Sequence, residues 1–230
     1  MKSALLFDLD GTLVESDPLH LAAFREAFAP FGVALDEDQY RRLIMGAPNS
    51  AIGEAFLPHL PVAQREAIID AKEAAFRRSF QTAKPTKGIG ALLDFAETAG
   101  LGIGLVTNAP RANAELMLAA LGLAERFPLL VIGAELSRSK PDPLPYLTAL
   151  QLTGAEAACS IAFEDSLSGI RAAAAAGLAV VGLTTGLDPA TLVAAGAAFG
   201  VADFTDPRIA ELIAARTNLR PRRDAVEEIA

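Results

Sequence analysis

The sequence predicts an α/β protein: an open parallel sheet with helices on both faces and an all-helical segment inserted after the first strand. Three observations predict it. Short, almost entirely apolar runs recur along the chain, and longer helical patterns separate them. Residues 15–83 break this alternation, because they contain helical patterns and no good strand. Alternation of strands and helices is typical of a parallel sheet, whereas a purely helical stretch indicates a separate layer or domain.

The strand candidates are apolar at nearly every position, as expected where both faces of a parallel strand are buried. They are Ser3–Phe7, Ile103–Thr107, Leu129–Ile132, Ser160–Phe163 and Ala179–Leu183. The helix candidates that accompany them are Ile89–Ala99, Asn113–Leu121, Pro143–Leu150, Ser166–Ala176 and Ala190–Ala195. This order predicts a Rossmann-like open sheet.

The helical insert contains four helix candidates, which are Pro18–Phe31, Glu37–Met45, Asn49–Leu57 and Val62–Phe80. Pro85 and Gly88 mark the return of the chain to the sheet. We therefore expect residues 1–14 and 84–215 to form the α/β core, residues 15–83 a helical domain, and residues 216–230 a solvated terminal tail. The hinges between the two domains are expected near Val14–Ser16 and Ala83–Thr86.

The overall charge restricts the possible partners. The 230 residues carry a formal net charge of −8, which disfavours binding to nucleic-acid backbones and to anionic membranes. No window approaches the roughly 18 uninterrupted apolar residues of a membrane span, and the N-terminal apolar stretch is too short for a signal peptide. We expect a cytoplasmic protein, monomeric by default, with neither a nucleic-acid nor a membrane partner.

Two acidic pairs follow predicted strands. Asp8 and Asp10 come directly after the first strand, and Glu164 and Asp165 follow the fourth. Ligand sites of open α/β sheets lie at the carboxyl ends of the strands, so the pairs should converge there. Oxygen donors without a His/Cys cluster favour Mg²⁺. The expected ligands are the carboxylates of Asp8 and Asp165 and the main-chain carbonyl of Asp10.

Three further residues at these strand ends, or in the loop beyond one, can bind an anion. Thr107 and Asn108 end the second strand, and their hydroxyl and amide groups can donate hydrogen bonds to phosphate oxygens. Lys140 lies in a segment stiffened by Pro141 and Pro143, where it can direct a point charge at a phosphate. Carboxylates, donors and one cation together are what phosphoryl transfer needs.

These segments, in this order and spacing, resemble the haloacid dehalogenase superfamily of phosphohydrolases. The matching residues are Asp8-Leu9-Asp10-Gly11-Thr12, Thr107-Asn108, Lys140-Pro141 and Glu164-Asp165. The helical insert is similar to the cap of the β-phosphoglucomutase-like branch, which includes phosphoglycolate and sugar-phosphate phosphatases. The resemblance implies a magnesium-dependent phosphatase acting on a small phosphorylated metabolite, with Asp8 as the nucleophile that forms an aspartyl-phosphate.

The resemblance also implies roles for the other site residues. Asp10 would protonate the leaving oxygen and then activate water. Thr107 and Asn108 would hold the transferring phosphoryl group, and Lys140 would neutralise charge beside it. Asp165 would bind Mg²⁺, with Glu164 as a direct or water-mediated ligand.

Other activities of the same superfamily are weighed by particular residues. Family dehalogenases and phosphonoacetaldehyde hydrolases replace the second aspartate of the first motif, so the presence of Asp10 disfavours both. Family mutases carry a basic pair in the cap loop, where this chain has Met45 and Asn49. That favours a phosphatase over a β-phosphoglucomutase-like phosphomutase.

Two cap residues and one further function stay open at this point. His20 matches a histidine that positions the general acid in this branch, or is a half-exposed helix residue, with equal weight for the two readings. Asn49 is a candidate cap contact to the substrate. The alternative from another class is a non-catalytic module that binds a phosphorylated metabolite or a protein.

Overall fold

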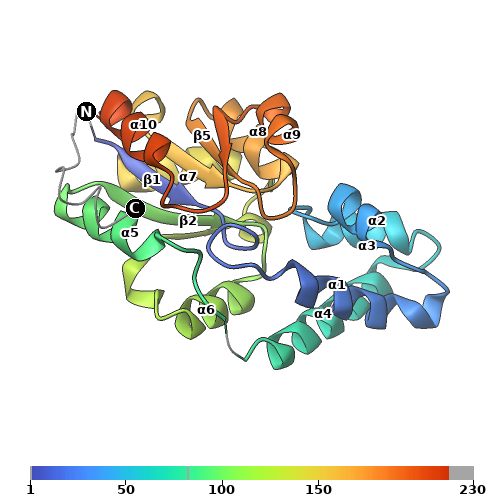
Figure 1. Ribbon diagram of the computed structural model, residues 1–230. Helices are drawn as coiled ribbons and strands as arrows, with labels where there is room; N and C mark the ends of the chain where they lie inside the picture. The colour runs from blue at the N-terminus through green and yellow to red at the C-terminus, as the bar shows by residue number, and fades with distance from the viewer. Residues whose placement is uncertain (1, 82, 218–230) are drawn as a thin grey trace.

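The central feature of the structure, a computed structural model that describes residues 2–81 and 83–217, is one parallel sheet (Figure 1). In this part of the chain the six strands are ordered β3-β2-β1-β4-β5-β6, and each neighbouring pair is parallel. The bounds are β1 Ala4–Phe7, β2 Gly102–Thr107, β3 Leu130–Ile132, β4 Ile161–Glu164, β5 Ala179–Leu183 and β6 Phe199–Val201. This confirms the predicted fold class.

All five predicted strands are present, with ends that differ by one residue at most. The edge strand β6, Phe199–Val201, was not predicted, although it pairs with β5. It is only three residues long and has Gly200 at its centre. A glycine in so short a run removes the apolar pattern on which strand prediction depends.

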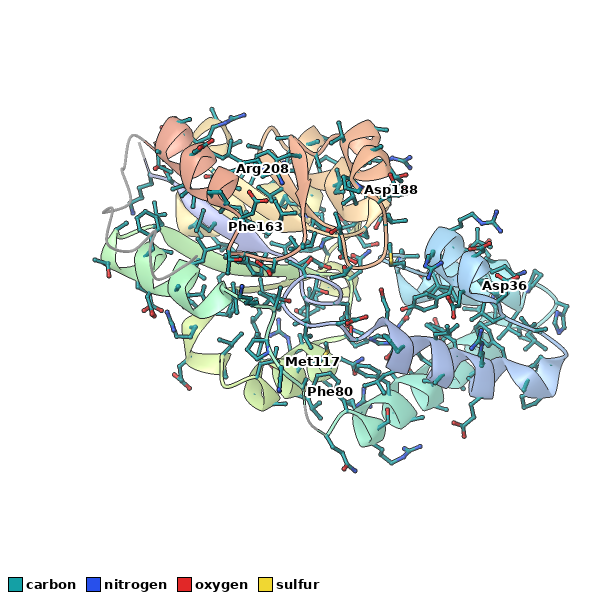
Figure 2. All side chains as sticks on the ribbon, in the orientation of Figure 1. Asp36, Phe80, Met117, Phe163, Asp188 and Arg208 are labelled. Atoms are coloured by element: carbon teal, nitrogen blue, oxygen red, sulfur yellow. The ribbon has the colours of Figure 1, made fainter. Side chains whose placement is uncertain are left out.

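Helices cover both faces of the sheet, because alternate residues of each strand point to opposite sides. Leu5 and Phe7 of β1 join one hydrophobic cluster, with Phe163 and Met117, both labelled in Figure 2. Residues from α5, α6 and α10 complete this cluster, while the opposite cluster contains residues from α7, α8 and α9. The bounds are α5 Ile89–Thr98, α6 Arg111–Ala120, α7 Leu144–Thr153, α8 Leu167–Ala175, α9 Pro189–Ala195 and α10 Pro207–Thr217. Short 3-10 segments are η2 Ala124–Arg126, η3 Gly133–Glu135 and η4 Ala157–Cys159.

The inserted helices lie beside the sheet layer, to the right in Figure 1. They are α1 Asp17–Phe28, α2 Glu37–Leu43, α3 Asn49–Phe56 and α4 Val62–Ser79, with the 3-10 segment η1 Ala29–Phe31 after α1. Phe24, Phe28 and Ile52 belong to a hydrophobic cluster of their own, but Phe76 and Phe80 of the same segment pack into a core cluster. The helical character of the insert is as predicted, whereas the domain boundaries remain a prediction.

The two segments that join the insert to the core lie against each other. The main-chain N–H of Thr86 donates to the carbonyl oxygen of Leu13 at 2.8 Å. The hydroxyl of Thr86 donates to the carbonyl oxygen of Thr12 at 2.7 Å. The chain therefore leaves and re-enters the core at one place, where the hydrogen bonds of Thr86 to Thr12 and Leu13 form what we call the clasp.

The C-terminal part of the chain differs from the prediction. Helix α10 extends through Thr217, so the expected tail does not begin at Arg216, whose guanidinium donates to the carbonyl oxygen of Ala158 at 3.0 Å. Residues 218–230 of the predicted tail lie outside the described residues. None of the helices in the described ranges has the length and apolar character needed to cross a membrane.

Candidate active site

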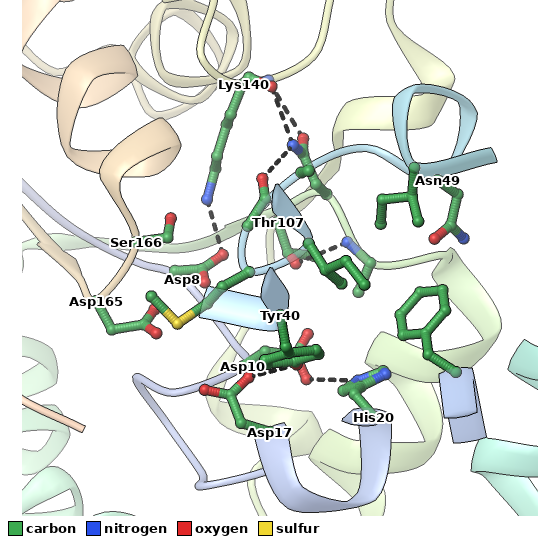
Figure 3. A pocket seen from close by; sticks show the side chains of 18 of the residues that line it. Asp8, Asp10, Asp17, His20, Tyr40, Asn49, Thr107, Lys140, Asp165 and Ser166 are labelled. Carbon is green, nitrogen blue, oxygen red and sulfur yellow. Dashed lines mark hydrogen bonds and ion pairs between the residues drawn. The ribbon is translucent and has the colours of Figure 1, made fainter. Parts of the chain in front are cut away.

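A cavity of about 70 Å³ lies between the carboxyl edge of the sheet and the inserted helices (Figure 3). Nearly all of the predicted site residues line it, and these are Asp8, Asp10, His20, Asn49, Thr107, Asn108, Lys140 and Asp165. Glu164 is fully buried directly behind them. The structure thus brings together segments that are more than 150 residues apart in the chain.

The turn after β1 places Asp8 and Asp165 at the same end of neighbouring strands. The main-chain N–H of Asp8 donates to the carbonyl oxygen of Phe163 at 3.0 Å, which continues the pairing of β1 with β4. Gly11 has φ +69°, and a Cβ there would overlap the carboxylate of Asp165. The motif needs glycine at this position both for its backbone conformation and for the close approach of Asp165.

Lys140 is the cation at the centre of the core side of the cavity. Its Nζ atom lies 2.7 Å from Asp8 Oδ1, 2.6 Å from Glu164 Oε1 and 2.6 Å from the carbonyl oxygen of Val106. Burial alone would lower the pKa of Lys140, but the carboxylates of Asp8 and Glu164 raise it above its ordinary value. The lysine is therefore a charged, triply bound group that fixes the direction of the Asp8 carboxylate.

Glu164 is bound by several donors at once. Besides Lys140, the phenol of Tyr146 donates to its Oε1 atom at 2.7 Å, and the hydroxyl of Ser166 donates to its Oε2 atom at 3.1 Å. Ser166 also accepts from the main-chain N–H of Gly169 at 3.0 Å as the cap of helix α8. Both carboxylate oxygens thus have protein partners, an arrangement that suits holding Lys140 in place.

Asp165 carries the strongest sign of a cation site. Its side chain is buried and accepts from the hydroxyl of Thr12 at 3.3 Å, and among the described residues it has no ion-pair partner. Burial and then repulsion from Asp8 raise the pKa of Asp165 well above its ordinary value. Oxygens of Asp8, Glu164 and Asp165 lie within 4.8 Å of one another. This oxygen-only donor set fits a divalent cation such as Mg²⁺, which would compensate the buried charge.

Burial and the neighbouring charged groups also shift the pKa of Asp8. Burial raises the pKa of Asp8, Lys140 lowers it and Glu164 raises it again, with a result of about 7. A cation beside Asp8 would favour its ionised form, which is the form that attacks an electrophile.

Asp10 faces the inserted helices. Its Oδ1 atom accepts from the hydroxyl of Ser16 at 2.5 Å and lies 3.1 Å from Nε2 of His20. Burial would raise the pKa of Asp10, but His20 and Ser16 lower it below its ordinary value. Because the side chain is directed to the helices, any part of Asp10 in binding a metal falls to its main-chain carbonyl.

A lysine orients the ring of His20. Nζ of Lys72 lies 2.8 Å from Nδ1 of His20, and an ammonium group can only donate. Nδ1 therefore accepts, which leaves the ring proton of neutral His20 on Nε2, facing Asp10. The His20 side chain is buried and stacks on Phe76 at a centroid distance of 3.8 Å, so the half-exposed alternative is wrong.

Thr107 and Asn108 differ in what they can offer a phosphate. Thr107 Oγ1 accepts from the main-chain N–H of Ala109 at 3.0 Å, which leaves its own hydrogen for a ligand. The side-chain amide of Asn108 donates to the carbonyl oxygens of Gly46 at 3.0 Å and Lys140 at 3.1 Å. The expectation that this amide donates to phosphate is therefore not supported, since its hydrogens are directed to two main-chain carbonyls.

The cap side of the cavity contains residues that the sequence analysis did not single out. They are Asp17, Tyr40, Lys72 and Glu73. The predicted Asn49 donates to Glu73 Oε1 at 2.9 Å, so this candidate contact lies in the cavity but is bound to a neighbour. The sequence did contain a pattern that could have identified the residues from helix α4. Helical spacing connects Ile69, Lys72, Glu73 and Phe76, and this spacing predicts that they share one buried face of the helix.

Buried carboxylates, one lysine and a threonine hydroxyl at the carboxyl edge of a parallel sheet define the class of enzyme that transfers phosphoryl groups. The comparisons with known proteins agree. Residues 5–183 match the model of the haloacid dehalogenase-like hydrolase family, and the chain belongs to that family.

The relatives are similar to this chain over most of its length. Protein CbbY of Rhodobacter capsulatus is 33% identical over 95% of this chain and 97% of that protein. Phosphoglycolate phosphatase of Xylella fastidiosa is 36% identical over 76% of each chain. The crystal structure of CbbY from Rhodobacter sphaeroides with xylulose-(1,5)bisphosphate is similar, with a TM-score of 0.74, 30% identity and coverage of 89% and 95%. The expected enzyme class, a phosphoric monoester hydrolase of the haloacid dehalogenase type, is confirmed.

Proposed function

We propose that this protein is a Mg²⁺-dependent phosphatase that hydrolyses a small phosphorylated metabolite, of the sugar-phosphate or phosphoglycolate type, through an aspartyl-phosphate on Asp8. The observation that carries the proposal is the contact of 2.7 Å between Lys140 and one carboxylate oxygen of Asp8 in a cavity that Asp10 and Thr107 also line. It leaves the other oxygen of Asp8 for attack on phosphorus.

The first half-reaction would use Asp8 and Asp10. The carboxylate of Asp8 forms a bond to phosphorus while the bond from phosphorus to the ester oxygen breaks. The leaving oxygen takes a proton from Asp10, which Ser16 and His20 hold in place. Lys140 and the hydroxyl of Thr107 offset the charge on the transferring group.

The second half-reaction would reverse the proton transfer. Asp10 accepts a proton from water as the water oxygen attacks phosphorus, and the bond from phosphorus to Asp8 breaks. The products are inorganic phosphate and free Asp8. Asp8, Asp165 and the main-chain carbonyl of Asp10 would hold Mg²⁺, which would supply positive charge to offset that of the phosphoryl group.

The cellular setting belongs to the same proposal. We infer a cytoplasmic monomer without nucleic-acid or membrane partners, which the net charge of −8 supports. A phosphomutase is the second candidate. The loop Met45–Asn49 lacks a basic pair, and this supports a phosphatase.

The test is release of inorganic phosphate from p-nitrophenyl phosphate and from a panel of sugar phosphates and phosphoglycolate. We expect turnover with Mg²⁺, loss of turnover with EDTA, and recovery when Mg²⁺ is restored. Asp8→Asn should lower kcat by at least about 10,000-fold, because it removes the nucleophile. Acid quench and mass spectrometry should find the phosphoryl group on Asp8.

Three results would contradict the proposal. Full activity of a correctly folded Asp8→Asn variant would exclude the nucleophile. Conversion of a sugar 1-phosphate to the 6-phosphate without free phosphate would identify a mutase. Saturable ligand binding with no phosphate release from any ester would identify a non-catalytic binding module.

A further inference from the structure

The cap side of the cavity, where the leaving group of a phosphate ester would lie, carries more negative than positive charge. Asp17 from helix α1 and Glu73 from helix α4 line it, and Lys72 is the lysine beside them. The phenol of Tyr40 donates to Asp17 Oδ1 at 2.7 Å, so the partner of this acidic group is neutral, and burial raises the pKa of Asp17 above its ordinary value. The Asp17 carboxylate is seen beside Asp10 and Tyr40 in Figure 3.

The charge of Lys72 is already engaged by the protein. Its Nζ atom lies 3.1 Å from Glu73 Oε1, 2.8 Å from Nδ1 of His20 and 3.8 Å from the ring centroid of Phe24. The lysine side chain is 1% exposed. A second anionic group in the cavity would therefore meet a lysine that is bound on several sides.

Glu73 is held as firmly as Lys72. Its Oε2 atom accepts from the side-chain amide of Asn113 at 2.7 Å, and its Oε1 atom accepts from Asn49 at 2.9 Å as well as from Lys72. Burial would raise the pKa of Glu73, but the charge of Lys72 and the amides lower it below its ordinary value. Glu73 is thus a fixed negative charge on the wall of the cavity.

The other lysine of the cavity, Lys140, lies at the opposite end, where the phosphoryl group would bind. Among the described residues that line the cavity, Lys140 and Lys72 are the lysines, and Lys140 is bound to Asp8 at the phosphoryl end. Burial lowers the pKa of Lys72, although the carboxylate of Glu73 opposes this shift. A phosphate or carboxylate on the leaving group would be buried against Asp17 and Glu73. Burying an anion beside like charge without a partner is strongly unfavourable.

We propose, on the basis of the phosphatase function proposed above, that the substrate is of the sugar-phosphate type and not of the phosphoglycolate type: a phosphate monoester whose leaving group carries hydroxyl groups and no second anionic group. Asp17 and Asn49 offer acceptors and a donor for hydroxyls on the cap side. The carboxylate of Glu73, together with the acidic group of Asp17, disfavours bisphosphates and phosphorylated carboxylic acids. Selectivity would thus differ from that of CbbY from Rhodobacter sphaeroides, whose structure holds a bisphosphate.

The experiment uses two matched pairs of esters with the full-length enzyme and Mg²⁺. One pair is glucose 6-phosphate and glucose 1,6-bisphosphate; the other is 2-hydroxyethyl phosphate and 2-phosphoglycolate. Members of a pair differ in the anionic group. We expect kcat/KM to favour the member without that group by about 100-fold in each pair.

Variants assign the selectivity to the wall of the cavity. Glu73→Gln keeps the size of the side chain and removes one negative charge from the wall of the cavity, so it should reduce both ratios by about 10-fold. Asp17→Asn should reduce them in the same direction and provides a second variant if Glu73→Gln fails to fold. Glu66→Gln is the control, because it makes the same change at an exposed position of the same helix α4 and should leave the ratios unchanged.

The outcomes separate this inference from the proposed function. Equal kcat/KM within each pair, or ratios that neither folded variant changes, would overturn the inference and leave the phosphatase intact. Absence of phosphate release from every ester, p-nitrophenyl phosphate included, would overturn the proposed function and this inference with it. A preference for the uncharged member that Glu73→Gln reduces would support the inference.

Discussion

The core half and the cap half of the cavity are built differently. On the core half, Asp8 and Glu164 lie at the ends of the adjacent strands β1 and β4. Nζ of Lys140 links them, because it lies 2.7 Å from Asp8 Oδ1 and 2.6 Å from Glu164 Oε1. On the cap half, the charged groups Asp17 and Glu73 come from helices whose packing depends on aromatic side chains. The core half is fixed by the sheet, whereas the cap half is fixed by how the helices pack together and close on the core.

We expect this difference to separate chemistry from selectivity. Groups that act on phosphorus need constant geometry, which a sheet supplies because every strand is bonded to its neighbours. Groups that face the leaving group can vary with the helices and can move with them. Three predictions follow the comparison, starting with the core half.

Lys140→Met should have the largest effect. It leaves Asp8 and Glu164 buried without their shared cation, so the free energy of unfolding should fall by about 3 kcal/mol. We expect kcat to fall by about 1,000-fold, because the transferring charge also loses its partner. Urea unfolding and phosphate release measure the two effects.

Lys2→Met is the matched control, since Lys2 is exposed on the surface and lies outside the expected hinges. It should change neither stability nor kcat. Wild-type stability and activity of Lys140→Met would show that the lysine network does not organise the core half.

Gly46→Ala tests how the two halves meet. The carbonyl oxygen of Gly46 accepts from Asn108 at 3.0 Å and from Ser168 at 2.6 Å, and a Cβ at this glycine would overlap Ser166. Closure of the helices on the core should be impaired, so kcat/KM should fall by about 100-fold.

Gly32→Ala separates this clash from backbone strain. Gly32 has φ +73°, close to the +70° of Gly46, but a Cβ there would meet no atom within 4 Å. Both variants should lose similar stability, about 1 kcal/mol, from the left-handed conformation. Equal activity of the two variants would mean that the contact of Gly46 with the core has no part in turnover.

His20→Gln should have the smallest effect, and that effect should depend on the leaving group. His20 positions Asp10, so proton delivery to an alkoxide leaving group should slow by about 10-fold. p-Nitrophenolate leaves without a proton, and its release should change little. Parallel kcat measurements with a sugar phosphate and p-nitrophenyl phosphate check this, and an equal loss on both esters would contradict the positioning role.

The residues of the core half of the cavity could be predicted from the sequence more fully than those of the cap half. Asp8, Thr107, Lys140 and Asp165 follow strands or lie in nearby loops, so a linear pattern of apolar runs marks where they should meet, and the structure brings them together. The direction of the Asn108 amide could not be predicted, because it depends on a carbonyl of the cap that is distant in sequence.

The cap half was harder to predict because its geometry arises from helix packing. Lys72 and Glu73 sit in a long, charged helix that reads as solvated, yet they lie on its buried face. The missed strand β6 has a similar cause, since Phe199–Val201 is ordered by pairing with β5. In both cases the deciding contacts are between segments, and they leave only a weak pattern in the chain itself.

The clasp of Thr86 on Thr12 and Leu13 has a consequence for how such proteins diversify. An inserted segment can be accommodated at this point of the sheet domain if its two ends lie close together. Helical segments of other length or composition could therefore be exchanged at this point while the sheet continues to fold. New specificities would then arise by replacing the helical insert, without altering the residues that we propose act on phosphorus.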